Sequence, residues 1–393
     1  MSKINLINST FLDHKKTKSE LIKFIKKSNK LSMGEQCEKY EIEFSKFQKR
    51  KYTVMFNSGS SANLGLLQAL KNLGFLKTND KICFSGVTWS TNVMPIIQLG
   101  MQPIPVDVNI NTLNCDSQNL IKILKIYKNI KVFFITNVLG LCSDIDNIRK
   151  ICKKNKIILI EDNCESFGSE FKKIKLGNFG LASTCSSYVG HHLSTIEGGT
   201  VSTDEYDLYN MLKIVRAHGW NRNVDYKYRK KLKKNLNVDS FYDLYTFYDL
   251  GYNLRPTEIN GFIGRKQLKL QSKNISTRMS NFYNLQQIMN SNKNYVSVAN
   301  DKMNILSNFA FPIIKSNKKN IKNIINYFIK SNIEIRPLVA GNITKQPFFK
   351  KYVKKNYNLP ISDHIHECGF YIPNHSELNN KDISYLKKVL RNI

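Results

Sequence analysis

Four short segments of the sequence contain residue types that could do chemistry. They are residues 57–62 (NSGSSA), 161–165 (EDNCE), 186–199 (SSYVGHHLSTIEGG) and 251–258 (GYNLRPTE). The first follows a predicted strand and precedes a predicted helix, so backbone N–H groups among its small residues could close on an anion, with the serine hydroxyls adding donors. This pattern fits a phosphate site and, equally well, a simple serine N-cap.

The second and third segments contain groups that titrate. Carboxylates at the tip of a buried strand, as at residues 161–165, are costly unless they face a cation or hydrogen-bond donors, which favours a ligand site over a solvated loop. His191 and His192 precede a Gly-Gly turn and could bind a metal, transfer protons or be structural. Because no third ligand has a sensible spacing, a metal site is disfavoured.

An α/β domain is predicted to position these segments. Apolar runs that predict buried strands lie at residues 51–56, 81–84, 103–106, 132–136 and 157–160, and amphipathic stretches that predict helices lie at 64–73, 91–99 and 145–155. The alternation predicts a mostly parallel sheet in a large domain, residues 1–260, followed by a smaller C-terminal α/β domain, residues 261–393. Ligands of such sheets gather beyond the carboxyl ends of the strands, where the four segments would meet.

Composition excludes several classes of protein. Of the 393 residues, 41% are hydrophobic, and 60 basic against 30 acidic side chains give a net charge of +30. No apolar run approaches the roughly 20 residues that cross a bilayer, and the N-terminus lacks a signal-peptide pattern, so we expect a cytoplasmic protein without a membrane partner. The lysines are spread along the whole chain, and the densest basic run, residues 227–234, lies in no recognisable nucleic-acid module. We therefore expect solvated basic faces and no nucleic-acid partner.

The eight cysteines are scattered through the chain and form no CxxC pair. Their spacing fits neither a zinc site nor an iron–sulfur cluster. In a chain of this size, reduced thiols are the expected state, and no metal is predicted.

In their order along the chain, the four segments resemble the sugar-nucleotide aminotransferase family. These are fold-type I enzymes, aspartate aminotransferase-like in fold, that use pyridoxal 5′-phosphate (PLP). The likeness rests on NSGSSA, on Trp89 in SGVTWST, on the EDxxExxG strand end, on a serine five residues before position 191, on EGG and on GYNxRxTE. It extends from about residue 30 to the C-terminus and implies a homodimer with a shared active site.

The resemblance implies which residues hold the cofactor phosphate. The backbone of Gly59 and Ser60 and the hydroxyl of Ser186 would bind it within one chain. Asn253 would reach the phosphate in the neighbouring subunit.

The resemblance also implies contacts with the pyridine ring. Trp89 would stack on the ring, Asp162 would pair with the ring nitrogen and keep it protonated, and Glu165 would lie near the ring hydroxyl, where most of the family has glutamine. His218, in an RxHG pattern, is predicted to contact the substrate or the cofactor. Arg336 is predicted to bind an anionic group of the substrate, with a structural ion pair as the alternative.

Position 191 departs from the aminotransferase pattern. Six residues before Glu197 the family's aminotransferases have the lysine that binds PLP covalently, and here that residue is His191. An imidazole cannot form that bond, so the cofactor would be held non-covalently, but it can move protons near neutral pH. This change, together with residues 336–342 (RPLVAGN) and 367–372 (ECGFYI), resembles the sugar 3-dehydratase branch of the family. Because no cysteine lies between Cys185 and Cys368, the likeness is to the branch's cluster-free group, which acts on GDP-4-keto-6-deoxymannose.

The resemblance therefore implies a 3-dehydratase of a GDP-4-keto-6-deoxy sugar in dideoxy sugar biosynthesis for surface glycans. Such an enzyme uses glutamate to form pyridoxamine 5′-phosphate (PMP), releases 2-oxoglutarate and ammonia, and has no iron–sulfur cluster. The alternatives are a nucleotide-sugar 4-aminotransferase, a non-catalytic PLP-fold regulator or nucleic-acid binder, and a cluster-dependent dehydratase. We expect His192 to be structural and residues 225–248 to shape the substrate pocket.

Overall fold

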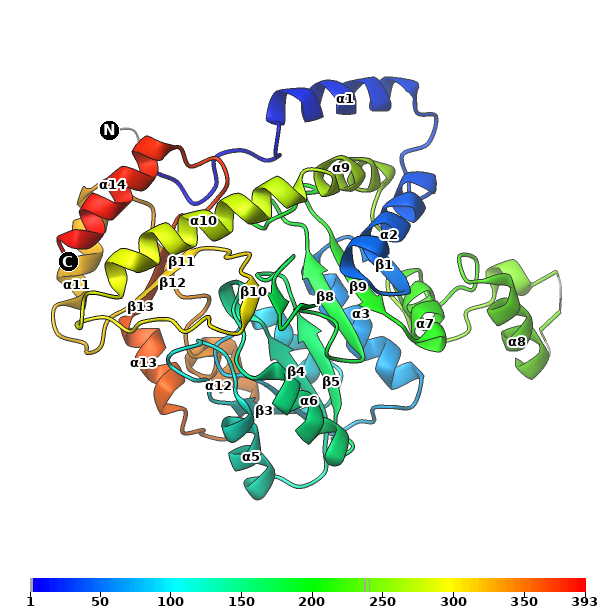
Figure 1. Cartoon of the computed structure of the whole chain (residues 1–393). Coiled ribbons are helices and arrows are strands. Elements are labelled where there is room, and N and C mark those ends of the chain that lie inside the picture. The colour runs from blue at the N-terminus through cyan, green and yellow to red at the C-terminus, as the bar shows by residue number, and fades with distance from the viewer. Residues whose placement is uncertain (1–2, 237, 240) are drawn as a thin grey trace.

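A seven-stranded sheet forms the centre of the molecule (Figure 1). The computed structural model describes residues 3–236, 238–239 and 241–393. The strand order is β1 (Tyr52–Phe56), β9 (Gly199–Thr203), β8 (Ala182–Ser186), β5 (Ile158–Asp162), β4 (Ile130–Thr136), β2 (Lys81–Ser85) and β3 (Gln102–Val106). All neighbours are parallel except β9, which runs antiparallel to both β1 and β8. The predicted mostly parallel sheet is confirmed.

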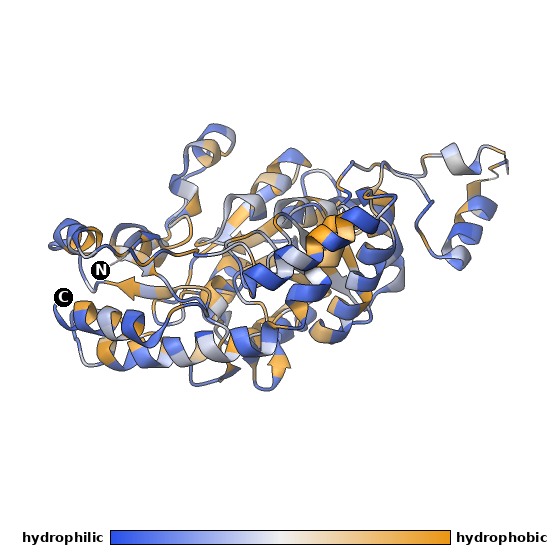
Figure 2. Ribbon diagram, turned by 90° about the horizontal axis from the view of Figure 1, so that it is seen from above, coloured by the Kyte–Doolittle hydropathy of each residue, from blue (hydrophilic) through white to orange (hydrophobic). Residues whose placement is uncertain are grey.

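Helices cover both faces of this sheet, which explains why its strands are apolar on both sides. In β4, Val132 and Phe134 pack in the core formed with α3 (Gly59–Asn72) and α7 (Tyr206–Arg216). Phe133 and Ile135 pack in the opposite core, under α5 (Ser117–Ile126) and α6 (Ile145–Lys154). Figure 2 shows apolar residues along the central strands and hydrophilic residues on the outer sides of the helices.

One predicted helix is divided. Residues 91–99 form a 3-10 turn, Ser90–Asn92, followed by the short helix α4 (Met94–Gln98). Pro95 is the reason, because it has no N–H group to continue a preceding helix but fits the first turn of a new one.

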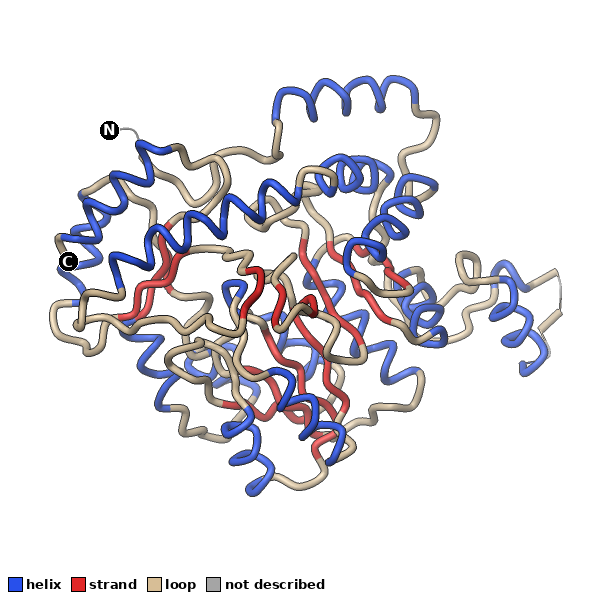
Figure 3. Tube along the Cα trace, in the orientation of Figure 1, coloured by secondary structure: helices blue, strands red, loops and turns tan. Residues whose placement is uncertain are grey.

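The C-terminal part of the chain forms a separate three-stranded antiparallel sheet, β11 (Phe311–Ile314), β13 (Gly369–Ile372) and β12 (Arg336–Pro337) (Figure 3). The helices of this part of the chain are α10 (Gln271–Met289), α11 (Ile321–Lys330), α12 (Pro347–Tyr352), α13 (Pro360–Cys368) and α14 (Asn380–Arg391). The boundary predicted between residues 260 and 261 falls within α9 (Glu258–Leu268). A small third sheet joins β10 (Met303–Ile305) to the hairpin β6 (Glu170–Phe171) and β7 (Ile174–Lys175).

Two further segments flank these sheets. The N-terminal residues run over the C-terminal part, where Ile4 pairs with Ile333, before α1 (His14–Lys27) and α2 (Glu35–Gln48). The helix α8 (Tyr226–Leu236) stands apart from the body of the molecule in both Figure 1 and Figure 2. Within the described residues, no helix combines the length and apolar character needed to cross a membrane.

Candidate active site

A cavity of about 300 Å³ lies where the main strands end and the C-terminal sheet begins. Eight of the ten predicted site residues line it: Gly59, Ser60, Trp89, Asp162, Glu165, Ser186, His191 and Arg336. They come from the carboxyl ends of β1, β2, β5 and β8, from the loop after β8, and from β12. The folding of a parallel sheet therefore gathers segments that are distant in the sequence.

Asp162 is a carboxylate held at the floor of this cavity. It ends β5 and is only 3% exposed. Its Oδ2 accepts hydrogen bonds from Asn63 Nδ2 (3.0 Å) and Asn92 Nδ2 (2.7 Å), and its Oδ1 accepts one from the Cys164 backbone N–H (2.8 Å). Neutral donors stabilise the charge without cancelling it, so the site can pair with a cationic group of a ligand.

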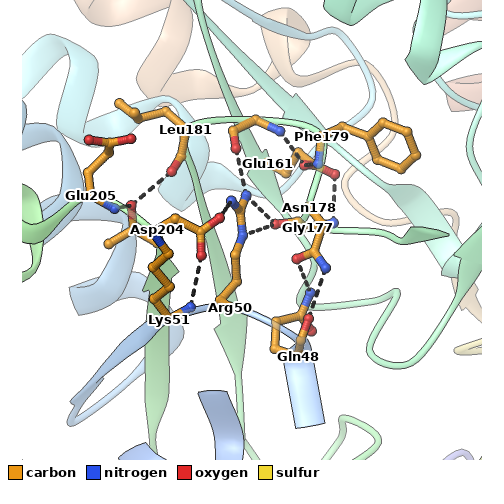
Figure 4. Close-up of polar contacts among 12 residues, drawn as sticks. Gln48, Arg50, Lys51, Glu161, Gly177, Asn178, Phe179, Leu181, Asp204 and Glu205 are labelled. Atoms are coloured by element: carbon orange, nitrogen blue, oxygen red, sulfur yellow. Dashed lines mark hydrogen bonds and ion pairs between the residues drawn. The ribbon is translucent and has the colours of Figure 1, made fainter. Parts of the chain in front are cut away.

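Glu161, the neighbouring carboxylate, does not line the cavity and instead bonds to the surrounding backbone (Figure 4). Successive side chains of a strand point to opposite faces, so Glu161 points away from the side that Asp162 faces. Its oxygens accept hydrogen bonds from the backbone N–H groups of Gly177 (2.7 Å), Phe179 (2.8 Å) and Gly180 (2.8 Å). Of the carboxylates in the 161–165 segment, only Asp162 and Glu165 border the cavity.

The turn before α3 has features of both predicted alternatives, a serine N-cap and an anion site. Ser58 is the N-cap, since its Oγ accepts a hydrogen bond from Ser61 N–H (3.0 Å). The backbone N–H groups of Gly59 and Ser60 have no acceptor among the described residues, and both residues line the cavity. A Cβ atom at position 59 would lie 2.6 Å from Ser186 Cβ, so only glycine lets the helix end approach Ser186. The result is a cradle of donors for an anion.

Gly199→Ala is expected to deform this cradle. A Cβ at position 199 would lie 2.3 Å from the carbonyl oxygen of Ser58 and 2.6 Å from the backbone nitrogen of Gly59, and neither backbone atom can move without shifting the start of α3. We expect a loss of about 2 kcal/mol or more in the free energy of unfolding. We also expect at least tenfold weaker binding of PLP, measured by fluorescence titration. Unchanged binding by a stable variant would contradict this geometry.

His191 lies in the cavity wall with its ring against Phe309 (5.3 Å between ring centroids) and Tyr188 (6.3 Å). Its Nδ1 has no hydrogen-bond partner among the described residues. Burial, opposed by the charge of Asp162 and assisted by that of Arg278, lowers the pKa of the imidazole to about 4. The ring is therefore neutral at neutral pH and can accept a proton.

His192 is held differently. Its Nε2 bonds to the carbonyl oxygen of Ser307 (2.9 Å), and the residue is 2% exposed and does not line the main cavity. Burial places the pKa of this ring well below its usual value. This geometry fits the structural role expected for it.

Glu165 is a carboxyl group without a cationic partner among the described residues. Its Oε2 accepts a hydrogen bond from the backbone N–H of Leu139 (2.9 Å), a residue in the left-handed region with φ of 55°. Burial, with a further contribution from the charge of Asp162, raises the pKa of Glu165 to about 7. Part of the population is therefore protonated at neutral pH and can donate a hydrogen bond into the cavity.

Glu165→Gln is expected to stabilise the cofactor-free protein in a pH-dependent way. Folding raises the pKa of Glu165 from 4.5 to about 7, so the folded wild type loses stability as pH rises through this window and the side chain ionises. Glutamine carries no charge. We expect the free energy of unfolding of the variant, relative to wild type, to increase by about 3 kcal/mol between pH 4 and pH 8, measured with urea. A difference that does not change with pH would contradict the raised pKa.

Two predicted residues, His218 and Asn253, lie outside the cavity of their own chain. His218 packs on Trp220 (4.8 Å between ring centroids), and its backbone N–H bonds to Tyr252 O (2.7 Å). Asn253 pairs with Ala217 as an isolated bridge and is exposed. The described residues of the 225–248 segment do not line this cavity either, so in a single chain the segment does not shape the pocket as expected.

The last residues of the 251–258 segment support the structure around the site. Glu258 accepts hydrogen bonds from the backbone N–H groups of Gly34 (2.9 Å) and Gln36 (2.9 Å) and so caps the N-terminus of α2. Thr257 and Asn260 form a capping box, and Asn260 Nδ2 also donates to the carbonyl oxygen of Glu197 (2.9 Å). Asn260, two residues after the motif, thereby ties the start of α9 to the loop that follows His191.

Several cavity residues were not singled out from the sequence. They are Asn92, Thr136, Tyr188, Arg278, Phe309 and Tyr371, with Asn63 behind Asp162. Asn63 falls directly after the NSGSSA segment, which was a usable signal, but nothing local marks Arg278. In the described part of the chain, no group of three or more His, Cys, Asp or Glu side chains is placed to hold a metal ion.

Comparisons with known proteins add a family and a fold. The profile of the DegT/DnrJ/EryC1/StrS aminotransferase family matches residues 13–391. The chain is 36% identical over 370 residues to a GDP-4-keto-6-deoxy-D-mannose 3-dehydratase of Escherichia coli O55:H7, covering 93% of this chain and 94% of that protein.

Solved structures agree with this likeness. One is a GDP-4-keto-6-deoxymannose-3-dehydratase with a trapped PLP-glutamate geminal diamine, with a TM-score of 0.90 and 34% identity over 98% of this chain and all of that one. Another is a histidine-to-asparagine mutant of such an enzyme, called ColD, with bound GDP-perosamine, with a TM-score of 0.89 and 33% identity over the same shares of the two chains. The α/β, PLP-enzyme fold expected from the sequence is confirmed.

Proposed function

The chain belongs to the DegT/DnrJ/EryC1/StrS aminotransferase family, and from this premise we propose that it is a PLP-dependent 3-dehydratase of a GDP-linked 4-keto-6-deoxy sugar. In this proposal, glutamate donates the amino group that converts PLP to PMP, and 2-oxoglutarate is released. The C3 hydroxyl of the sugar is then lost and ammonia is released. The product would be a 4-keto-3,6-dideoxy sugar for surface glycans.

One observation carries this proposal: the cavity has a histidine, His191, at the position of the family's lysine. Of the residues that line the cavity, all within the described part of the chain, none is a lysine. A lysine-dependent aminotransferase needs that amine to hold PLP and to move protons. The near full-length similarity to proteins named as 3-dehydratases points to the same reaction.

The residues of the cavity fit PLP. The cradle at Gly59, Ser60 and Ser186 suits its phosphate, Asp162 is a charged partner for a protonated ring nitrogen, and Trp89 offers an aromatic face that is 56% exposed in the single chain. When bound, PLP supplies an electron sink for carbanion chemistry.

The protein's own part in the reaction is mainly proton transfer. The neutral imidazole of His191 would take up the proton that must leave, and the resulting imidazolium would return it to the departing C3 hydroxyl. Asp162 would hold the proton on the ring nitrogen, and Glu165 would hydrogen-bond to the ring hydroxyl. Phe309 and Tyr188 pack beside the imidazole and would help to orient its ring.

A homodimer is part of the proposal. Asn253 lies outside the cavity of its own chain, so we expect Asn253 of the partner subunit to reach the phosphate instead. Aromatic side chains of the 225–248 segment offer a surface on which a partner subunit could pack. Five of them are each more than half exposed in the single chain: Tyr226, Phe241, Tyr242, Tyr245 and Phe247. Light scattering at micromolar concentration tests the dimer.

The experiment that tests the function is one incubation of the protein with PLP, glutamate and GDP-4-keto-6-deoxymannose. We expect a nucleotide sugar lighter by one oxygen in the mass spectrum, with ammonia released only when glutamate is present. An amino sugar as product would instead show that the site transaminates. No change in that sugar or in related nucleotide sugars would rule out the dehydratase.

A further inference from the structure

Arg278 is a buried cation that the proposed proton chemistry leaves without a role. It lies on α10, is only 6% exposed, and lines the cavity together with His191 and Phe309. It also borders a smaller adjoining hollow formed by the N-terminal residues 6–12 and Glu377. Its position between these spaces makes its charge available to a bound molecule.

The hydrogen bonds of Arg278 leave its charge intact. Nη1 donates to backbone carbonyl oxygens, including that of Phe309 (2.9 Å), and Nε donates to Asn274 Oδ1 (3.1 Å). All of these acceptors are neutral, and no carboxylate in the described part of the chain lies within ion-pair distance. Nη2 has no acceptor among the same residues. Burial lowers the pKa of the guanidinium to about 10, so it remains positive at neutral pH.

The other buried or cavity-lining arginines differ in this respect. Arg216, equally buried, is paired with Glu41, and Arg336 is partly exposed and paired with Glu334 (2.9 Å). A buried charge without a counter-ion is unfavourable unless something else supplies the opposite charge. At Arg278 no carboxylate of the described residues is in contact with the guanidinium, and Glu377 acts on it only from beyond ion-pair distance.

We propose that Arg278 binds a carboxylate of the amino donor and thereby selects a dicarboxylic amino acid for the cavity. This inference rests on the proposed function, which requires glutamate as donor. The planar guanidinium matches a carboxylate in shape and charge, and Nη2 is free to donate to it. The cofactor phosphate has separate donors at Gly59, Ser60 and Ser186, so the charge of Arg278 is left for the second anion.

The test uses glutarate, a dicarboxylate that lacks the amino group and cannot react. Its dissociation constant for the PLP-loaded protein is measured by calorimetry for wild type, Arg278→Gln and Arg278→Lys. The matched control is Arg265→Gln, an arginine on α9 that pairs with Glu43 outside the cavity. We expect glutarate binding to weaken by about 10- to 100-fold in Arg278→Gln. In Arg278→Lys we expect a smaller loss, because lysine keeps the charge but lacks the planar pair of N–H donors of arginine. In the control we expect a change of less than twofold.

Three results would overturn the assignment. They are absence of glutarate binding to wild type, equal binding by a folded Arg278→Gln, and, where that variant does not fold, equal binding by Arg278→Lys. The proposed function is tested separately with wild type loaded with PMP and given GDP-4-keto-6-deoxymannose without any amino donor. Failure of that reaction removes the dehydratase but leaves the glutarate result to decide whether Arg278 binds carboxylates.

Discussion

His191→Asn is expected to abolish dehydration while leaving the cofactor site intact. Asparagine keeps a polar group of similar size but cannot accept a proton at neutral pH, and proton transfer by a placed side chain contributes about 10²- to 10⁴-fold to a rate. We therefore expect turnover of GDP-4-keto-6-deoxymannose to fall by about 1,000-fold or more, measured by mass spectrometry with PMP supplied directly. The dissociation constant for PLP should change by less than about threefold, because the phosphate and ring contacts come from other residues.

A matched control separates this effect from the loss of any histidine. His364 lies on α13 outside the cavity, where its Nε2 bonds to the carbonyl oxygen of Lys315 (2.9 Å). His364→Asn should leave turnover within about twofold of wild type. If His191→Asn retained wild-type turnover, His191 would lose its central role.

His191→Lys is expected to bind PLP covalently and to lose dehydration. The surroundings that lower the pKa of the imidazole to about 4 also disfavour a charged ammonium, so the introduced amine would be neutral in part and reactive toward the PLP aldehyde. After borohydride reduction, mass spectrometry should find the cofactor on the peptide that contains residue 191, and wild type should show no such adduct. Turnover should fall at least as far as in His191→Asn.

The outcome of this second substitution bears directly on the proton-transfer argument. A variant that carried PLP covalently and still removed the C3 hydroxyl at the wild-type rate would show that an amine serves as well as an imidazole. Formation of an amino sugar by His191→Lys would instead be consistent with the family's lysine chemistry restored in the same cavity. Both products are resolved in the same mass spectrum.

The neighbouring residues Glu161 and Asp162 show how far sequence patterns could go. The apolar run ending at residue 160 predicts a buried strand, and adjacent carboxylates must then point to opposite faces. Which face borders a cavity depends on what packs against the sheet from elsewhere in the chain. In the structure, Glu161 accepts hydrogen bonds from the backbone of residues 177–180, and Asp162 borders the cavity.

Contacts between segments far apart in the sequence explain why the other predicted residues differ from their expected positions. Asn253 and His218 belong to recognisable motifs, but those motifs pair with each other through Ala217 and lie away from the cavity of their own chain. Arg278 has no local signature, since a single arginine on a long helix is ordinary until the helix is placed beside a cavity. Its lack of a contacting carboxylate among the described residues is a property of the assembled structure.

The sequence by itself determined the α/β class, the family and the replacement of the expected lysine by His191, because strand and turn patterns are local and motif order is read directly along the chain. Only the tertiary structure decided which side chains share the cavity, and how burial lowers the pKa of His191 and raises that of Glu165. The physical reason is that burial, charge pairing and close backbone approach are set by contacts between segments far apart in sequence, such as Gly59 with Ser186.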